Sequence, residues 1–372
     1  MPTLNLERAG MDTMTDVDVV VTGGVDTHKD LHVAAALDQF GRLLGTEEFP
    51  TNSAGYRDLH AWLGGFGALD SVGVEGTGAW GAGLTRYLRC NGVAIVEVSR
   101  PNRQRRRLKG KSDTLDAEAA ARAVQSGEAR GLPKGGEGPI EAIRILRVAR
   151  RSAIKARTQA ANQIHSIIDT CPEDLRSSFI GLRPKAQIAK AARLRRGDAD
   201  TPKGAAKTAL ASLARRWMDL DAEIDELDIL LGQITLQTAP SLLAMPGVGP
   251  DVAGALLSAV GDNPGRLRSE ASFAALCGVT PLDASSGRQK RHRLNRGGDR
   301  TANSALFRIV LCRLIRDEDT RDYMARRIAE GKTKKEVIRC LKRYVARQVY
   351  RVILEDLEVS AAGPPNHLER AA

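Results

Sequence analysis

The chain has 372 residues, a formal net charge of +11 and an aromatic content of only 4%. Its length exceeds what a single hydrophobic core usually serves, so we expect two or three domains. The basic excess predicts a polyanionic partner, with nucleic acid as the first expectation, because basic side chains that bind phosphates release the counterions condensed on them. The alternative interpretation is a charge that only aids solubility.

Cysteine spacing and hydropathy narrow the class of protein further. The five cysteines form no CxxC pair and have no histidine at zinc-finger spacing. This spacing argues against a structural zinc site or a disulfide framework and fits a reducing cytoplasm. No apolar run reaches the ~20 residues of a membrane span, and residues 1–17 lack the apolar core of a signal peptide. We expect a soluble protein of the cytoplasm without a membrane partner.

Residues 18–130 carry alternating strand and helix patterns after a flexible leader at 1–17. Three apolar segments joined by short polar connectors predict an antiparallel meander, and helix, strand, helix, strand and helix patterns follow. This order is that of a ribonuclease-H-like domain, a mixed sheet flanked by helices. The expected strands cover 17–26, 31–38, 43–49, 71–76 and 93–99, and the helices 52–66, 81–90 and 113–126.

A glycine-rich linker at 131–138 leads to a region, 139–236, with helical periodicity. Apolar residues recur at spacings of three and four, which predicts a coiled coil. The alternative is an ordinary helical hairpin within one core. The expected seam positions are Leu146, Ala149, Ala153, Ala156, Ala160, Ile164 and Ile167, then Leu210, Leu213, Trp217, Leu220, Ile224, Leu227, Leu231 and Ile234. The polar stretch between the two series would form the tip.

Residues 240–357 form the last predicted domain, which is helical, and 358–372 a disordered tail. The sequence PGVG at 246–249 separates an apolar segment from an amphipathic helix. This is the pattern of a helix–hairpin–helix motif, in which Gly247 and Gly249 would let backbone N–H groups approach a DNA phosphate.

Four acids fall at predicted strand ends and at a helix start. Asp26 closes the first strand, Glu75 ends the fourth, and Asp113 and Asp116 lie three residues apart on one helix face. Together they would repel one another unless divalent cations neutralise them, and Mg²⁺ prefers such oxygen ligands. The alternative for Asp113 is a helix N-cap. Two cations would activate a nucleophile and stabilise the leaving oxygen of a phosphodiester.

A basic run lies directly before the last two acids. Such runs are commonly a solvated surface, but this position favours a grip on a nucleic-acid backbone, and the lack of aromatic residues argues against base stacking. The residues are Arg103, Arg105, Arg106, Arg107, Lys109 and Lys111.

The segments GVDTHKDLHVAAALDQFGRLL, VEGTGAWGAGLTRYL, NRQRRRLKGKSDTLDAEAAARA, PGVGPDVAGALLSAVGD and CGVTPLDASSG resemble the DEDD-type transposases of the insertion sequence 110 family. The resemblance implies a RuvC-like domain whose four metal-binding acids are Asp26, Glu75, Asp113 and Asp116. It also implies a coiled coil, a C-terminal transposase domain, two Mg²⁺ ions (with Mn²⁺ as a substitute), and donor and target DNA. A bridge RNA encoded by the element would guide recombination, and the protein would be a dimer or tetramer in the prokaryotic cytoplasm or nucleoid.

The resemblance further implies a serine nucleophile in the segment TPLDASSG, at Ser286 with Ser285 as the rival. A serine ester to DNA preserves the energy of the phosphodiester bond. Basic neighbours that would bind the scissile phosphate are Arg288, Lys290, Arg291, Arg293 and Arg296. Three alternatives stay open: a Holliday-junction-type metal nuclease without serine chemistry, an actin-like or sugar-kinase-like ATPase, and a non-catalytic nucleic-acid binder.

Overall fold

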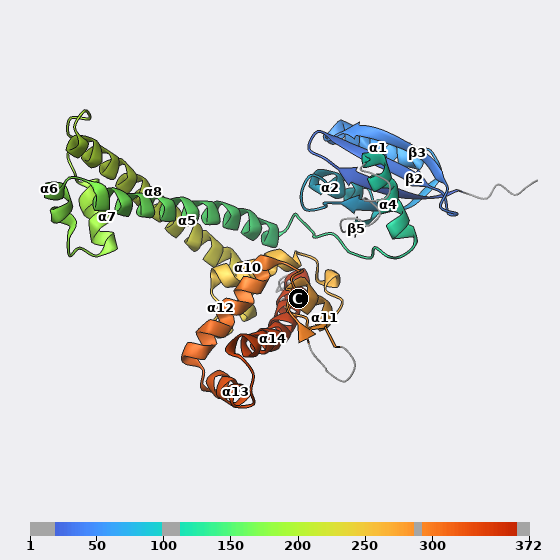
Figure 1. Ribbon diagram of the computed structural model, residues 1–372. Coiled ribbons are helices and arrows are strands. Elements are labelled where there is room, and N and C mark those ends of the chain that lie inside the picture. Colours follow the sequence, from blue (N-terminus) through green and yellow to red (C-terminus); the bar gives the residue numbers. More distant parts are fainter. Residues whose placement is uncertain (1–18, 99–111, 286–291, 363–372) are drawn as a thin grey trace, which may run out of the picture. The chain divides into compact units, whose positions relative to one another are not determined.

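The structure, a computed structural model, describes residues 19–98, 112–285 and 292–362. It separates into two compact units whose boundary lies between Lys134 and Gly135 (Figure 1). We call residues up to 134 the sheet unit and those from 135 the helical unit. The leader predicted at 1–17 lies outside the described residues, as does 363–372 of the predicted tail.

The sheet unit contains a five-stranded mixed sheet in the order β3-β2-β1-β4-β5. The first three strands are antiparallel, while β4 and β5 continue the sheet in parallel with β1. The predicted meander is therefore confirmed, and the strand order is ribonuclease-H-like. The strands are β1 (Val20–Thr27), β2 (Leu31–Leu37), β3 (Leu43–Pro50), β4 (Ala68–Glu75) and β5 (Ala94–Val98).

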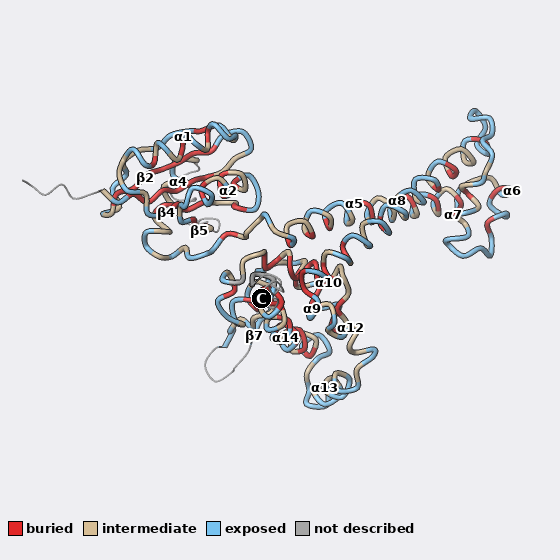
Figure 2. Tube along the Cα trace, turned by 180° about the vertical axis from the view of Figure 1, so that it is seen from behind, coloured by how far each residue is buried: buried red, intermediate tan, exposed pale blue. Residues whose placement is uncertain are grey.

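Helices cover both faces of this sheet. On one face α1 (Ser53–Gly64) and α2 (Ala82–Cys90) bury leucines against Val25 and Val74. On the other face α4 (Asp113–Gln125) packs Ala117 against Val33. Because side chains alternate along a strand, each strand contributes to both cores. Figure 2 shows burial concentrated along the strands.

The helical unit begins with two long helices, α5 (Pro139–Thr170) and α8 (Pro202–Thr238), in the region of the predicted coiled coil. They are antiparallel, since Arg150 pairs with Asp228 and Arg157 with Asp221. The α8 seam positions are all buried or half-buried, as predicted. On α5 one predicted seam position is wrong. Ala149 is exposed, and the buried position is Arg147, which forms an ion pair with Asp251.

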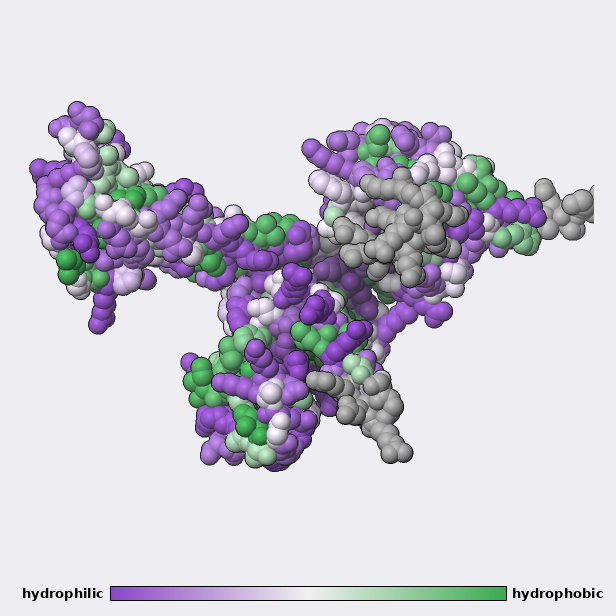
Figure 3. Space-filling view, viewed as in Figure 1, coloured by the Kyte–Doolittle hydropathy of each residue, from purple (hydrophilic) through white to green (hydrophobic). Residues whose placement is uncertain are grey.

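The stretch between these helices forms the tip of the pair, as expected, and it has a core of its own. Short helices α6 (Glu173–Arg176), η1 (Ser177–Phe179) and α7 (Pro184–Ala192) bury Phe179 and Ile188 against Ile164 and Leu210. The tip projects away from the remaining helices of the unit (Figures 1 and 2). Figure 3 shows apolar residues along the helix pair only as separate small patches.

The rest of the helical unit is a compact group of helices around α10 and α14. The last helix continues to Ala362, past its expected end at Leu357, so the predicted tail at 358–372 is wrong for 358–362. A small hairpin, β6–β7, interrupts the helices. The elements are α9 (Pro240–Ala244), α10 (Pro250–Val260), η2 (Pro264–Arg266), α11 (Glu270–Leu276), β6 (Leu282–Asp283), β7 (His292–Arg293), α12 (Arg300–Arg316), α13 (Glu318–Ala329) and α14 (Lys334–Ala362).

Within the three described ranges, none of the helices combines the length and the apolar character that a bilayer span requires.

Candidate metal centre

Two of the predicted acids, Asp26 and Glu75, lie at the same edge of the sheet. The parallel strands β1 and β4 pair Val25 with Val74, so Asp26 and Glu75 follow at matching positions. The two valines point into the core beneath α1 and α2. Successive side chains alternate between faces, so both acids belong to the face covered by α4.

Glycines in the two central strands let α4 lie directly on this face. A Cβ atom added at Gly24 would lie 2.2 Å from the carbonyl oxygen of Ala117, and one at Gly73 would lie 2.9 Å from that of Ala120. No larger residue fits between the backbones. This close approach fixes the first turn of α4, where Asp116 is only 6% exposed.

Asp26 and Asp113 meet across this contact, with His28 between them. The three residues each offer one ligand atom, and these atoms lie within 4.8 Å of one another. His28 Nδ1 is 4.0 Å from Asp26 Oδ2, and His28 Nε2 is 4.0 Å from Asp113 Oδ1. The imidazole therefore faces one carboxylate with each nitrogen. The Asp26 side chain is 9% exposed and that of Asp113 is 47% exposed, so the group opens to solvent on the α4 side.

Glu75 and Asp116 are placed at the same edge but do not belong to that three-residue group. The backbone carbonyl of Glu75 accepts a hydrogen bond of 2.7 Å from the Thr27 hydroxyl, which joins the ends of β1 and β4. Asp116 is buried in the first turn of α4. Of the four predicted acids, the structure thus brings Asp26 and Asp113 together and holds the other two on the elements that carry them.

His28 is the residue of this group that the sequence prediction missed. It lies two residues after Asp26, in the turn at 28–30 that connects β1 to β2. A side chain two residues beyond a strand-end acid can return to the same face of the sheet, and this spacing is the signal that could have identified it. An imidazole next to two carboxylates changes the donor set from all-oxygen to mixed.

The donor set fits a divalent cation. Carboxylates suit Mg²⁺ and Mn²⁺, whereas imidazole suits Zn²⁺ and other transition metals better. Asp26 and Asp113 are therefore the residues that would bind Mg²⁺. Glu75 and Asp116 lie on adjoining elements from which carboxylates could complete the coordination.

The predicted nucleic-acid contacts are distributed over both units. The basic run from Arg103 to Lys111 lies outside the described residues, as do Arg288, Lys290 and Arg291. Arg293 and Arg296 are exposed at and after β7.

The predicted phosphate-binding turn lies between α9 and α10. Gly247 has a φ of +85°, and a Cβ atom there would lie 3.3 Å from the Cβ of Cys312 on α12. Gly249 is the N-cap of α10 and has open space around its α-carbon. Asp251 occupies the first turn of α10 and pairs with Arg147 and Arg308. The role of this turn in DNA binding stays a prediction.

The predicted nucleophile, Ser286, lies outside the described residues, while its rival Ser285 is described. Ser285 is exposed, and its N–H donates a hydrogen bond of 2.8 Å to Asp283 Oδ1. Hydrogen bonds from the Ser285 side chain and backbone hold the pKa of the Asp283 carboxyl below its usual value. Asp283 is paired with His292 across the hairpin, so the segment carrying Ser286 starts and ends at β6–β7.

Comparisons with known proteins agree on one family for both units. Residues 23–172 match the DEDD family model of IS110, described as a transposase, and residues 239–325 match the transposase IS116/IS110/IS902 family. "Insertion element IS110 uncharacterized 43.6 kDa protein" of Streptomyces coelicolor (strain ATCC BAA-471 / A3(2) / M145) is 35% identical over 96 residues. That stretch is 26% of this chain and 24% of the relative, so the chain matches about a quarter of the relative's length. Because both matched segments belong to models of one family and follow each other along the chain, the chain belongs to the IS110 family of transposases.

Proposed function

We propose that the protein is a transposase that cuts and rejoins the donor and target DNA of an insertion sequence. The observation that supports this proposal is the group of Asp26, His28 and Asp113 at the edge of a ribonuclease-H-like sheet, in a chain of a transposase family. An acidic cation site in a protein of net charge +11 suits a polyanionic substrate.

Asp26, Glu75, Asp113 and Asp116 would bind the divalent cations, Mg²⁺ or Mn²⁺ in its place. When bound, a pair of such cations supplies activation of the attacking hydroxyl and charge stabilisation at the scissile phosphate. The chain's own contribution is rigidity. Asp26 is fixed on a central strand, and α4 is locked on the sheet at Gly24. The carboxylates are thereby positioned before substrate arrives, which lowers the cost of reaching the reactive geometry.

Ser286 is the proposed nucleophile. Its hydroxyl oxygen attacks phosphorus, a serine–phosphate bond forms, and the bond from phosphorus to one flanking nucleotide oxygen breaks. The serine proton is released and the leaving oxygen takes up a proton, so the number of phosphoester bonds is conserved. In the second step a hydroxyl oxygen of the other DNA strand attacks the phosphorus of the serine ester and loses its proton. The bond from phosphorus to the Ser286 oxygen breaks, and that oxygen takes up a proton. No ATP is needed.

The test is a covalent-adduct assay on end-labelled DNA of the insertion junction, with and without Mg²⁺. Wild-type protein should retain label through denaturing electrophoresis, and Ser286→Ala should lose both adduct and recombination. Ser285→Ala is the matched control. It removes the adjacent hydroxyl, the one bonded to Asp283, and should keep the adduct. Loss in Ser285→Ala with retention in Ser286→Ala would assign the nucleophile to Ser285.

A second candidate function is a Holliday-junction-type metal nuclease. The observation that favours it is that the acidic group alone has the ligands for hydrolysis by water. It predicts that Ser286→Ala cuts branched DNA at the wild-type rate and that no adduct forms at any time.

Two partners belong to the same proposal. The first is a bridge RNA encoded by the element, which would pair with donor and target DNA in the prokaryotic cytoplasm. The second is another copy of the chain, in a dimer or tetramer. Ile145, Val148 and Ile229 on the helix pair are each more than half exposed, at 55%, 58% and 62%. Apolar side chains in this position suit a contact between copies. Mixing Asp26→Asn with Ser286→Ala protein tests it, because regained activity requires sites shared between chains.

A further inference from the structure

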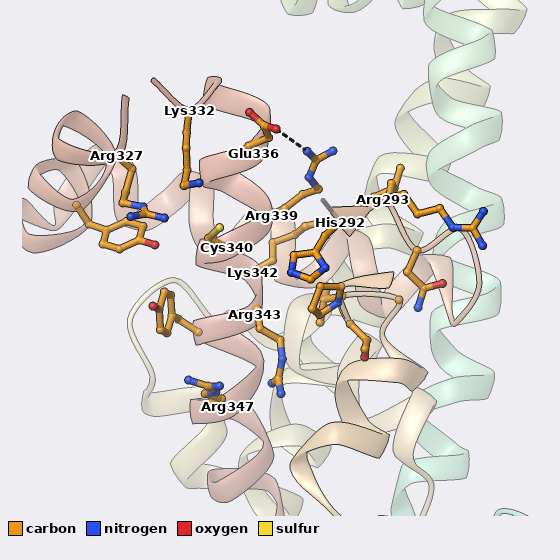
Figure 4. Close-up of a pocket in the computed structure, with 18 residues that line it drawn as sticks. His292, Arg293, Arg327, Lys332, Glu336, Arg339, Cys340, Lys342, Arg343 and Arg347 are labelled. Atoms are coloured by element: carbon orange, nitrogen blue, oxygen red, sulfur yellow. Dashed lines mark ion pairs between the residues drawn. The ribbon is translucent and has the colours of Figure 1, made fainter. Parts of the chain in front are cut away.

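The helical unit contains a basic pocket of about 480 Å³, whose lining includes Arg293 of the predicted contacts. It lies between the β6–β7 hairpin and the α13–α14 turn (Figure 4). His292 and Arg293 of β7 form one side. The other side is formed by the basic residues Arg327, Lys332, Arg339, Lys342, Arg343 and Arg347. We call this the α14 pocket.

Acidic residues in and around the α14 pocket do not match this number of cations. Glu336, the one carboxylate in the lining, is 3.8 Å from Arg339. Glu270 of α11 is shared by Arg343 and Arg347. Among the described residues, Lys332 and Lys342 form no ion pair at all. The pocket therefore keeps a net positive charge after its internal ion pairs are counted.

Lys342 is the strongest indication of an anionic ligand. Only 8% of it is exposed, yet it lines the pocket, and its ammonium donates a single described hydrogen bond of 2.9 Å, to Asn303 Oδ1. Asn303 is held in turn by the carbonyls of Cys277 and Gly278, at 2.8 and 3.2 Å. Burial lowers the pKa of Lys342, and the positive charge of Arg339 lowers it further. A buried cation without a carboxylate partner lowers stability. An anion bound in the pocket would offset both the burial of the Lys342 ammonium and its repulsion by Arg339.

The arrangement of the arginines favours an extended anion over a small one. Arg339, Arg343 and Arg347 follow each other at intervals of four residues, so they form a row along α14. At a rise of about 1.5 Å per residue, the row from Arg339 to Arg347 is about 12 Å long. Figure 4 shows Lys332 and Arg339 toward one end of the pocket and Arg347 toward the other. A chain of phosphates can contact the whole row, whereas one phosphate ion can contact only part of it.

We propose that the α14 pocket binds the sugar-phosphate backbone of a DNA strand, independently of base sequence. The proposal rests on the proposed function, because it takes DNA as the substrate, and it adds a subsite made by the α13–α14 turn and α14. The donors are arginines and lysines, which neutralise phosphates and position a duplex without reading its bases.

The experiment measures the salt dependence of DNA binding by full-length protein, without divalent metal so that no strand is cut. Fluorescence anisotropy with a labelled duplex over a series of NaCl concentrations gives the slope of log K against log salt. The double variant Lys332→Gln/Arg339→Gln should lower the magnitude of that slope by about 2, one for each lost phosphate contact, equally for unrelated sequences. Both side chains are accessible enough to be changed without disturbing the core.

The matched control is Arg316→Gln/Lys334→Gln, which removes two exposed cations of the same unit that do not line the pocket. Its slope should change by less than half as much. A second readout is acetylation of lysines in the wild-type protein, followed by mass spectrometry. DNA should protect Lys332 more than Lys334.

Three results would overturn the proposal: an unchanged slope in the pocket variant, an equal loss in the control, or a loss seen with RNA duplex and not with DNA. Failure here is separable from failure of the serine mechanism. If the pocket variant keeps the wild-type slope while wild-type protein forms the Ser286 adduct, only the pocket proposal is wrong. If the pocket variant has a reduced slope while wild-type protein forms no adduct, only the serine chemistry is wrong.

Discussion

The sheet unit and the helical unit place charge in opposite ways. At the edge of the sheet, Asp26 of β1 and Asp113 in the first turn of α4 lie on either side of the His28 imidazole. In the α14 pocket, arginines and lysines from α13, α14 and the turn between them gather around one carboxylate, Glu336. Each cluster gathers side chains of mainly one charge, and the signs of the two clusters differ.

The difference shows which ligand each cluster suits. Excess carboxylate charge is relieved by a divalent cation, and excess ammonium and guanidinium charge by phosphate. An enzyme that acts on phosphodiesters needs both a cation site and a basic surface. The cations neutralise the scissile phosphate, and the basic surface binds the rest of the polyanion. A contrast is given by Asp251 and its partners Arg147, Arg150 and Arg308, which we call the Asp251 cluster. Its charges are paired within the protein, so its role is to stabilise the fold.

The largest expected effect is on activity at the acidic edge. Asp26→Asn keeps the shape of the side chain and removes its charge, so cation binding should fail and strand transfer should drop about a thousandfold or more. This corresponds to several kcal/mol of transition-state stabilisation. The measurement is the transfer rate under saturating Mg²⁺, together with metal affinity by calorimetry. Asp30→Asn, in the same β1–β2 turn, is the control and should transfer at the wild-type rate. Full recombination by Asp26→Asn would rule out the metal role of the edge.

The second effect is on stability, at a place where charges are paired. Arg147 is 5% exposed and bonds Asp251, which also pairs with Arg150 and Arg308. Burial lowers the pKa of Arg147, and Asp251 opposes this. Asp251→Asn should therefore lower the free energy of unfolding of the helical unit by about 3–5 kcal/mol, because it leaves a buried guanidinium without its counter-charge. Urea denaturation measures the change.

The control for that experiment is Asp221→Asn. Its ion pair with Arg157 also involves α5, which it joins to α8, but both side chains are more than a quarter exposed, at 28% and 29%. Such a pair contributes about 1 kcal/mol or less. Equal losses in the two variants would show that burial does not distinguish the Asp251 cluster from a surface pair.

The smallest expected effect is a pH dependence in the sheet unit. His32 is fully buried on β2, both ring nitrogens lack a hydrogen-bond partner among the described residues, and the ring stacks on Tyr56 at 5.7 Å. Burial lowers its pKa to about 4 from a model-peptide value of 6.5. The unfolded chain thus binds the proton first, so stability is complete above about pH 6.5 and falls by up to about 3 kcal/mol as pH drops to 4.

Hydrogen exchange of the β2 amides between pH 4 and 7 measures this loss, after correction for the intrinsic exchange rate. His32→Phe keeps the stack on Tyr56 and should flatten the profile. His60→Phe changes a partly exposed ring that contacts Tyr87 edge-on, and its profile should follow wild type. A steep profile that persists in His32→Phe would assign the pH dependence to other groups.

Much of the fold could be predicted because its patterns are local. Alternation and short polar connectors predicted the meander, and spacings of three and four predicted the long helices. The prediction of buried positions failed where two neighbouring faces of one helix both carried apolar residues. Ala149 fits the apolar repeat of α5 but is exposed, because the adjoining face with Arg147 packs against α10. The end of α14 was also missed, since no residue near Leu357 terminates a helix.

The sequence by itself determined the positions of the four acids, because a strand end and a helix start are local features that place a side chain at a sheet edge. Only the tertiary structure decided which groups meet. It brought His28 between Asp26 and Asp113 through a turn, and it joined β7 to α14 around Lys342. Both arrangements depend on packing between residues distant in sequence, such as α4 on Gly24, which no local pattern encodes.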